Sequence, residues 1–171
     1  MTQSDRRVVI TGMGLISPIG NSSTDLWDSL SQQKSGVRLL SNLPTEHFPS
    51  DFGGECTDFT GSIDSFGPLE KKLQRSIKKG LRLMCREIQL GAAAAQLALT
   101  DSGLDSGSID PSRIGTLFGS DYIITSPLDF VEGIRACLDA DEQFSFDKWA
   151  EHGLTKVEPL WLLKYLPNMP A

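Results

Sequence analysis

The sequence predicts an α/β fold with an incomplete sheet, and three observations carry this prediction. Two short apolar runs, at residues 8–10 and 113–120, each end at glycine, which is typical of buried central strands. Between them, apolar residues recur at three- and four-residue steps from about residue 68 to 102, which predicts one long helix. The length of 171 residues suits one domain. Two strands alone leave open sheet edges.

The first run, Val8-Val9-Ile10, is followed by Gly12 and Gly14. A glycine has no Cβ, so the backbone there can turn tightly or let another segment approach closely. A dinucleotide-binding loop would need glycine or alanine at position 17, where Ser17-Pro18 stands instead. A structural turn is therefore favoured over a phosphate-binding loop.

The next segment carries helix-capping residues, Ser22 and Asp25, and the helix is expected to fade by Ser35-Gly36. Residues 39–67 are rich in turn formers, and four phenylalanines are spaced among them. We expect an ordered loop excursion with one short strand, held to the core by those rings. The rings are Phe48, Phe52, Phe59 and Phe66.

The long helix, about residues 68–102, begins with a strongly basic stretch and continues into an alanine-rich half. The alanines predict close packing in the domain. The basic stretch allows two interpretations, a solvated helix face or a docking surface for an acidic partner. Its candidate docking residues are Lys71, Lys72, Arg75, Lys78 and Lys79.

Downstream of the second strand, Ser126-Pro127 opens another helix, and a short helix closes at His152-Gly153. The apolar stretch at residues 160–166 would form an exposed patch unless more chain or a partner covered it.

Composition excludes several classes of function. The net charge of −6 leaves no excess of cations to neutralise phosphates, so nucleic acid is not expected as a partner. No apolar run approaches the ~20 residues that a membrane span needs, and the polar start has no signal-type block after it. We therefore expect no membrane span and a cytoplasmic location.

The cysteines and histidines show no catalytic or metal-binding pattern. Cys56, Cys85 and Cys137 are widely spaced, which fits neither a metal site nor a disulfide framework. Cys85 and Cys137 fall in helical stretches and are expected to be buried apolar groups, so none of the three is a good nucleophile. No motif surrounds His47 or His152.

Several motifs together resemble the amino-terminal part of the β-ketoacyl-acyl-carrier-protein synthases. They are V-V-I-T-G-M-G-L-I-S-P-I-G at the start, Leu26-Trp27-x-x-Leu30, Lys34-Ser35-Gly36-Val37, the alanine-rich helix ending in Asp101-Ser102-Gly103-Leu104, and the Arg113-Ile114-Gly115 start and Gly119-Ser120 end of the second strand. Gln74-Arg75 replaces the usual Asp-Arg, which indicates a divergent member. The resemblance covers nearly all of residues 1–171. It implies part of the amino-terminal half of a thiolase-like, α-β-α-β-α layered fold, without the carboxyl-terminal half.

The resemblance implies an acyltransferase that condenses an acyl thioester with malonyl-carrier protein in fatty-acid or polyketide synthesis. The family's nucleophilic cysteine and catalytic histidines would follow Ala171, so no catalytic residue, cofactor or metal is expected in this chain, which we expect to be inactive alone. Acyl carrier protein is the implied partner, with a homodimer or a ketosynthase-like heterodimer as the assembly. Residues implied at the acyl pocket or dimer interface are Tyr122, Ile123, Trp161 and Leu162.

Two alternatives remain open. One is a non-catalytic partner subunit of the chain-length-factor type. The other is a scaffold fragment that must oligomerise, and for this we expect the isolated chain to aggregate or self-associate. A nucleotide-binding protein would show a shift in melting temperature with NAD or ATP, and we expect none.

Overall fold

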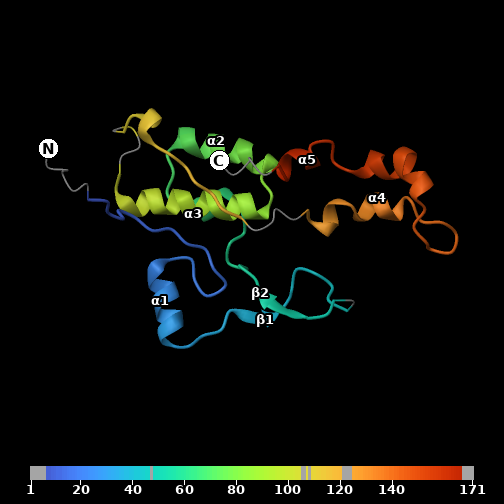
Figure 1. The fold of residues 1–171 in the computed structure, drawn as a ribbon, viewed down its shortest axis with the longest axis horizontal. Coiled ribbons are helices and arrows are strands. Elements are labelled where there is room, and N and C mark those ends of the chain that lie inside the picture. Colours follow the sequence, from blue (N-terminus) through green and yellow to red (C-terminus); the bar gives the residue numbers. More distant parts are fainter. Residues whose placement is uncertain (1–6, 47, 105–106, 108, 121–124, 167–171) are drawn as a thin grey trace, which may run out of the picture. The chain divides into compact units, whose positions relative to one another are not determined.

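The computed structural model of the protein describes residues 7–166 except 47, 105–106, 108 and 121–124 (Figure 1). The chain forms two compact units, Met1–Ile77 with Leu90–Gly115, and Lys78–Gln89 with Thr116–Ala171. The elements of the described residues are, in order, α1 Ser23–Ser31, β1 Val37–Leu39, β2 Phe52–Gly54, η1 Ile63–Phe66, α2 Lys71–Gly80, η2 Leu81–Leu83, α3 Arg86–Ser102, η3 Pro111–Arg113, η4 Pro127–Asp129, α4 Val131–Arg135, η5 Phe146–Lys148, the π-helix η6 Trp149–Gly153, η7 Leu154–Lys156 and α5 Trp161–Lys164.

Helix α1 begins at the predicted capping residues. The Ser22 hydroxyl accepts a hydrogen bond from the Asp25 backbone N–H at 3.1 Å and donates to the Asp25 carboxylate at 2.6 Å. The first of these bonds satisfies a backbone donor that the first helical turn leaves without a partner, so the predicted cap is confirmed. The helix ends at Ser31, and its buried Ser29 hydroxyl donates to the Ile19 carbonyl at 2.7 Å.

The loop excursion contains strand β2, which pairs antiparallel with strand β1 at the start of the excursion. Strands β1 and β2 pair Val37 with Gly54 and Leu39 with Phe52 (Figure 1). Only half of the predicted anchoring by phenylalanine is present. Phe59 and Phe66 are buried with ring centroids 6.3 Å apart, whereas Phe48 and Phe52 are exposed.

The two predicted core strands are not strands in this structure. Val8, Val9 and Ile10 are 94%, 68% and 85% exposed, and Leu117 in the second run is 99% exposed. No ladder pairs either run with another part of the described chain. The prediction of buried strands was wrong because apolar, β-branched residues favour an extended backbone, but a strand also needs a neighbour to exchange hydrogen bonds with it.

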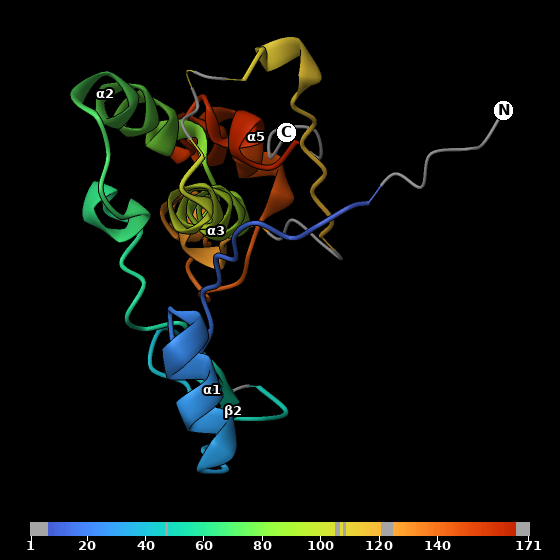
Figure 2. The same ribbon diagram turned by 90° about the vertical axis from the view of Figure 1, so that its left-hand side faces the viewer.

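Gly12 and Gly14 lie against α3, whose axis is seen nearly end-on in Figure 2. A Cβ at Gly12 would overlap the Ala98 carbonyl oxygen, and one at Gly14 would overlap the Ala94 carbonyl oxygen and the Ala98 nitrogen. Neither glycine has a positive φ. Of the two roles predicted for these glycines, close approach of another segment is therefore the one observed.

The single helix predicted over about residues 68–102 is two helices, so that prediction was wrong. Helix α2 ends at Gly80, the 3-10 turn η2 follows, and Met84 has the extended angles φ −100° and ψ 120° before α3 begins at Arg86. Glycine weakens a helix, and the carbonyl of Met84 accepts a hydrogen bond from the Gln89 side chain at 3.1 Å instead of an intrahelical one. The apolar periodicity continues across the break, which is why sequence spacing did not reveal it.

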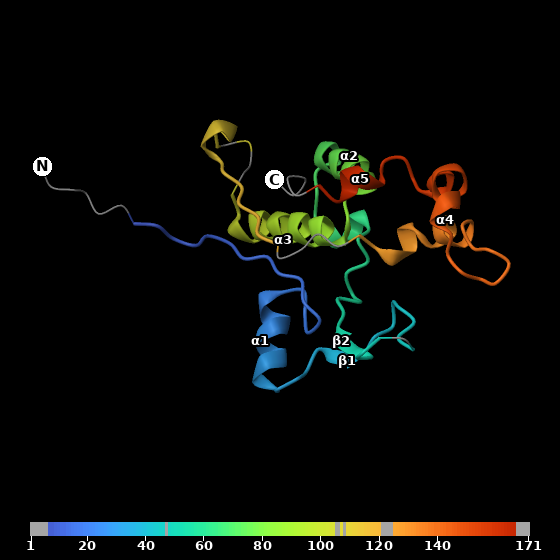
Figure 3. The ribbon, with the colours of Figure 1, turned by 45° about the vertical axis from the view of Figure 1, so that its right-hand side comes forward.

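The second unit joins Lys78–Gln89 to a series of short helical turns from η4 to α5, which are drawn in orange and red in Figure 3. Its core contains the fully buried Cys137 and the buried Gly133 and Gly153, which both approach the Trp149 ring closely. The predicted short helix ending at Gly153 is confirmed as η6, although η7 continues directly from it. Among the described residues, no helix is both long and apolar enough to cross a membrane.

Candidate functional site

The first candidate site is the basic face of α2. The helix sequence KKLQRSIKKG contains five cations and no acid, and the five candidate docking residues are all exposed. At 100° per residue, Lys71, Lys72, Arg75, Lys78 and Lys79 occupy roughly a third of the helix circumference. Leu73 and Ile77 lie on the opposite side, so the helix presents a continuous positive surface to solvent.

These cations are not neutralised locally. The ion pairs found within the described ranges join Arg135 to Glu132 and Lys164 to Glu158, and neither involves α2. Lys71 and Lys72 stand in the first helical turn, where the positive end of the helix dipole disfavours cations, whereas Lys78 and Lys79 stand in the favourable last turn. Lys71 and Lys72 therefore lower the stability of the helix slightly. A surface of cations without neighbouring acids is suited to attract an anionic partner.

The second candidate site is an aromatic cluster at α5. The Trp161 ring meets the Phe130 ring edge-on with centroids 5.2 Å apart, and Tyr165 follows one helical turn later with its centroid 6.4 Å from Trp161. The Tyr165 hydroxyl donates to the Asp129 carboxylate at 2.5 Å and accepts from the Ser126 N–H at 3.2 Å. Together these contacts hold α5 against η4.

Burial and the hydrogen bond to Asp129 raise the pKa of Tyr165 to about 12, because both disfavour the phenolate. Beside it, Lys164 forms an ion pair with Glu158 at 2.6 Å, which raises the pKa of Lys164. Tyr165 is therefore a protonated structural donor at neutral pH and does not act as a base.

The sequence-predicted pocket or interface residues divide into two groups. Tyr122 and Ile123 lie outside the described residues. Trp161 and Leu162 are neighbours on α5, where Trp161 faces Phe130 and Leu162 is 54% exposed. Because Trp161 and Leu162 are consecutive in the chain, their proximity does not test the predicted pocket or interface, which stays a prediction. Sequence reasoning missed Tyr165, although its spacing of four residues from Trp161 places both on one helix face.

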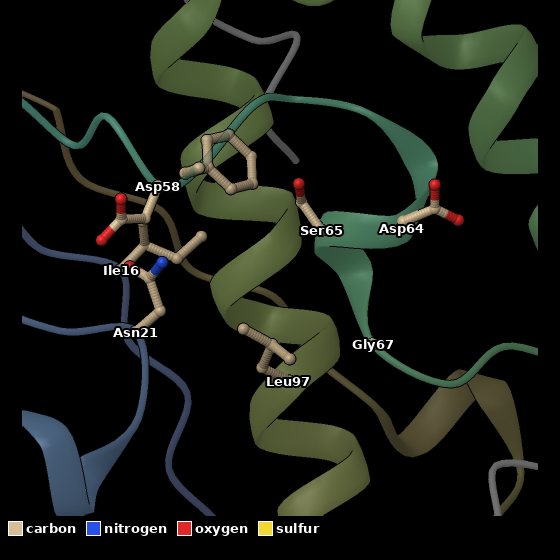
Figure 4. Close-up of a pocket in the computed structure, with 8 residues that line it drawn as sticks. Ile16, Asn21, Asp58, Asp64, Ser65, Gly67 and Leu97 are labelled. Carbon is tan, nitrogen blue, oxygen red and sulfur yellow. The ribbon is translucent and has the colours of Figure 1, made fainter.

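The third candidate site is a cavity of about 250 Å³ in the first unit (Figure 4). Its walls come from the segment after Gly14, from the loop before η1, from η1 and from α3. The lining includes three apolar side chains and several polar ones, principally Ile16, Asn21, Asp58, Phe59, Ser65 and Leu97. No sequence pattern indicated this cavity, because it joins residues that are far apart in the chain.

The cysteines do not form a catalytic centre in the described structure. Cys85 and Cys137 are buried as predicted, and Cys56 is half-buried. Burial raises the pKa of the Cys85 thiol, and the nearby Glu87 carboxylate raises it further, so Cys85 resists forming the reactive thiolate. No group of histidine, cysteine and acidic residues in the described part of the chain is arranged to hold a metal ion.

Comparison with known proteins decides the family. The family model described as "Beta-ketoacyl synthase, N-terminal domain" matches residues 5–147. The chain belongs to the β-ketoacyl synthase family. The resemblance seen in the sequence motifs is therefore confirmed.

Curated relatives of this β-ketoacyl synthase chain include a polyketide beta-ketoacyl synthase and a 3-oxoacyl-[acyl-carrier-protein] synthase. It is 39% identical over 115 residues to "Granaticin polyketide putative beta-ketoacyl synthase 1" of Streptomyces violaceoruber, and the aligned region covers 67% of this chain and 25% of the relative. It is 32% identical over 168 residues to "3-oxoacyl-[acyl-carrier-protein] synthase 2" of Vibrio harveyi, and the aligned region covers 98% of this chain and 34% of the relative. The chain thus spans between a quarter and about a third of these relatives' lengths.

A solved structure supports the fold class of this β-ketoacyl synthase chain. "The ishigamide ketosynthase/chain length factor" superimposes with a TM-score of 0.62 over 97% of this chain and 35% of that chain, at 20% identity. Identity this low bears on the fold alone. The predicted α/β class, a part of the amino-terminal half of a thiolase-like fold, is confirmed by this similarity.

Proposed function

We propose that this chain is the amino-terminal part of a 3-oxoacyl-acyl-carrier-protein synthase, which condenses an acyl thioester with malonyl-carrier protein. The observation that carries the proposal is the 32% identity over 98% of the chain to a relative named as that enzyme. The similarity to polyketide synthase relatives leaves fatty-acid and polyketide synthesis both within the proposal.

The test is acyl transfer by the natural polypeptide that carries this chain. We expect it to take up a labelled acyl group from acyl-carrier protein as a thioester and, after malonyl-carrier protein is added, to release the 3-oxoacyl product. A polypeptide that is folded but takes up no label and forms no product would overturn the proposal of a condensing enzyme.

A non-catalytic partner subunit is the second candidate, and one observation favours it. The solved structure that this chain resembles is titled as a ketosynthase and chain length factor. A partner subunit predicts no acyl uptake by itself, together with a stable complex and recovered condensation when a catalytic ketosynthase is added. Size-exclusion chromatography of the mixture distinguishes this outcome from simple inactivity.

We propose further that the basic face of α2 docks the acyl carrier protein. The support is the set of five exposed cations on one helix face, which suits an acidic protein surface. An exposed ion pair contributes up to ~1 kcal/mol, and charge reversal replaces attraction by repulsion. Reversal of two cations should therefore weaken binding about tenfold or more.

The docking test compares two double variants with the same change in net charge. Lys71→Glu with Lys72→Glu alters the basic face, and Lys34→Glu with Lys156→Glu alters exposed lysines outside α2. We expect calorimetric titration with carrier protein to show weaker binding for the first pair only, and an affinity that falls with added salt. Equal affinities for the two variants would contradict docking on α2.

For α5 we propose an interface role, which rests on the exposure of Leu162 and its neighbours Leu160 and Leu163 at 54%, 49% and 37%. Trp161 would position this surface through its contact with Phe130, while a role for Tyr122 and Ile123 at the acyl pocket stays a proposal from the family resemblance. Sedimentation should show that Leu162→Glu reduces self-association or pairing with a ketosynthase-like partner. An unchanged assembly would remove Leu162 from the interface.

A further inference from the structure

Residues 8–11 form an extended segment whose backbone has no partner in the described part of the chain (Figure 3). The segment joins no ladder or bridge, and its N–H and C=O groups make no hydrogen bond to another described residue. Its side chains Val8, Val9 and Ile10 are 94%, 68% and 85% exposed. Unpaired backbone groups beside exposed β-branched side chains are the properties of a strand that can pair with another strand.

Helix α3 leaves this segment uncovered because the helix ends too early. Gly14 lies against Ala94 and Ala98. Gly12 lies against Ala98 and Ser102, and Ser102 is the last residue of α3. Two residues of extended chain therefore advance by about one helical turn. At this rate the residues before Gly12 lie beyond the end of the helix, where a second strand can approach them.

The segment is apolar on both of its faces. Successive side chains of an extended chain point to opposite sides, so Val8 and Ile10 lie on the side of Gly12, and Val9 lies on the other side. A partner strand that pairs with this segment therefore needs apolar residues on both faces as well.

The order of residues 7–11 meets that requirement by itself. In an antiparallel pair of two copies centred on Val9, each Val9 lies opposite the other, Val8 lies opposite Ile10, and Arg7 lies opposite Thr11. Every apolar residue then meets an apolar residue, and no like charges meet. The segment is thus complementary to a second copy of itself.

The two-stranded sheet of the first unit is less suited to such pairing. The same arrangement of two β1 strands would place Arg38 opposite Arg38, which like-charge repulsion disfavours. At β2, the Ser50 hydroxyl accepts from the Phe52 N–H at 3.2 Å and donates to the Phe52 carbonyl at 3.3 Å, so these two backbone groups already have a partner.

We propose that residues 7–11 pair antiparallel with the same residues of a second copy of this chain, with the two-fold axis at Val9. Only a few residues of each copy take part, so the interface is smaller than the roughly 1,200 Å² or more that stable complexes bury. We therefore expect a reversible dimer whose fraction rises with protein concentration. The proposal does not depend on condensing activity, and it uses a surface other than α5.

Cysteine variants of the 171-residue chain test the position of the axis. Opposite residues of antiparallel strands have Cα atoms about 4.5–5.5 Å apart, a separation that a disulfide can span. We expect Val9→Cys to form a cross-linked dimer in a buffer of oxidised glutathione. Thr11→Cys is the control, because its two copies lie four residues out of register, ~13 Å apart along the strands.

A mixture of Arg7→Cys and Thr11→Cys chains should restore the cross-link, since the pairing places these positions opposite each other. Peptide mapping separates these bonds from any that involve the native Cys56, which is half-buried. Leu162→Glu, which alters α5, should leave the Val9→Cys cross-link unchanged.

Sedimentation at several protein concentrations measures the association itself. Ile10→Lys places a charge opposite Val8 of the second copy, and we expect it to weaken association about tenfold or more. Leu117→Lys is the matched control, because Leu117 is 99% exposed and lies outside the segment. Circular dichroism verifies that each variant is folded.

Three results would overturn the proposal. One is a folded chain that stays monomeric at every concentration, or whose residues 8–11 are protected from hydrogen exchange while it is monomeric, which would indicate pairing within the chain. The second is equal cross-linking of Val9→Cys and Thr11→Cys, which would indicate contact without a register. The third is association that Ile10→Lys and Leu117→Lys change equally.

Discussion

The contact between Gly14 and α3 gives a sharp prediction of stability. A Cβ at position 14 would lie closer than 3.0 Å to three atoms of the helix: the Ala94 carbonyl oxygen, the Ala98 nitrogen and the Leu97 Cβ. Two of these are backbone atoms that cannot rotate away. Gly14→Ala therefore requires the segment to move about 1 Å from the helix, and overpacking of this kind costs about 1–3 kcal/mol.

We expect Gly14→Ala to lower the free energy of unfolding by about 2 kcal/mol or more, near the upper end of that range. This is roughly a 30-fold change in the ratio of folded to unfolded chain. The Met13 N–H adds to the cost, because it donates to the Asp101 carboxylate at 2.9 Å and would be displaced with its neighbour. Urea unfolding followed by circular dichroism measures the loss. Hydrogen exchange should show weaker protection of the α3 amides.

Two other glycines separate the possible causes. A Cβ at Gly115 would meet nothing within 4 Å and its φ is not positive, so Gly115→Ala should be neutral or slightly stabilising. Gly103 also has open space but a φ of +63°, so Gly103→Ala should cost about 1 kcal/mol through backbone strain alone. A Gly14→Ala variant as stable as Gly115→Ala would refute the close approach to α3.

Four further predictions concern three other contacts. Tyr165→Phe should lower the free energy of unfolding by about 1 kcal/mol in urea titrations, because Asp129 loses its donor. Since the pKa of Tyr165 is raised to about 12, its contribution to stability should be complete below pH ~10 and lost as pH rises toward 12. Melting temperatures measured across this range should show the loss, and Tyr165→Phe should remove that pH dependence. Backbone hydrogen bonds lower the pKa of Glu55, so its contribution should be present above the ordinary carboxyl pKa and lost on further acidification, and Glu55→Gln should remove that dependence. Gly153→Ala should destabilise the chain by about 1–3 kcal/mol and change the fluorescence of Trp149, whose ring a Cβ would overlap.

Local chemistry made some elements of this fold predictable from sequence. The cap of α1 depends on Ser22 and on Asp25 three residues later, and the spacing alone indicates the bond from the Asp25 N–H to the Ser22 hydroxyl. The burial of Cys85 and Cys137 was also predicted, although both lie just outside helices, Cys85 before α3 and Cys137 after α4. For the cap the determining neighbours are within a few positions along the chain, whereas Cys137 is also covered by the distant Gly153.

Features that depend on distant residues were not predictable in this way. The apolar run at residues 8–10 has the composition of a buried strand, but no described segment pairs with it and it is exposed. The break between α2 and α3 at Gly80 leaves the apolar spacing intact, so periodicity alone did not show it. The cavity beside Asn21 is lined by residues between positions 16 and 97 of the chain, so it forms only on folding. The Asn21 side-chain oxygen is likewise left without a hydrogen-bond partner only in the folded chain.

The two ends of α2 offer a way to separate docking from helix stability. Lys71 and Lys72 oppose the helix dipole in the first turn, and Lys78 and Lys79 favour it in the last, each by about 0.3–1 kcal/mol. Glutamine replacement of either pair removes two positive charges from the same face. If the face docks an acidic carrier protein, both double variants should bind it more weakly by a similar factor. Their stabilities should change with opposite signs, the first pair raising the melting temperature and the second lowering it. If only the less stable double variant binds the carrier protein more weakly, binding depends on helix stability and not on charge. The cations of α2 would then serve only as a solvated helix face.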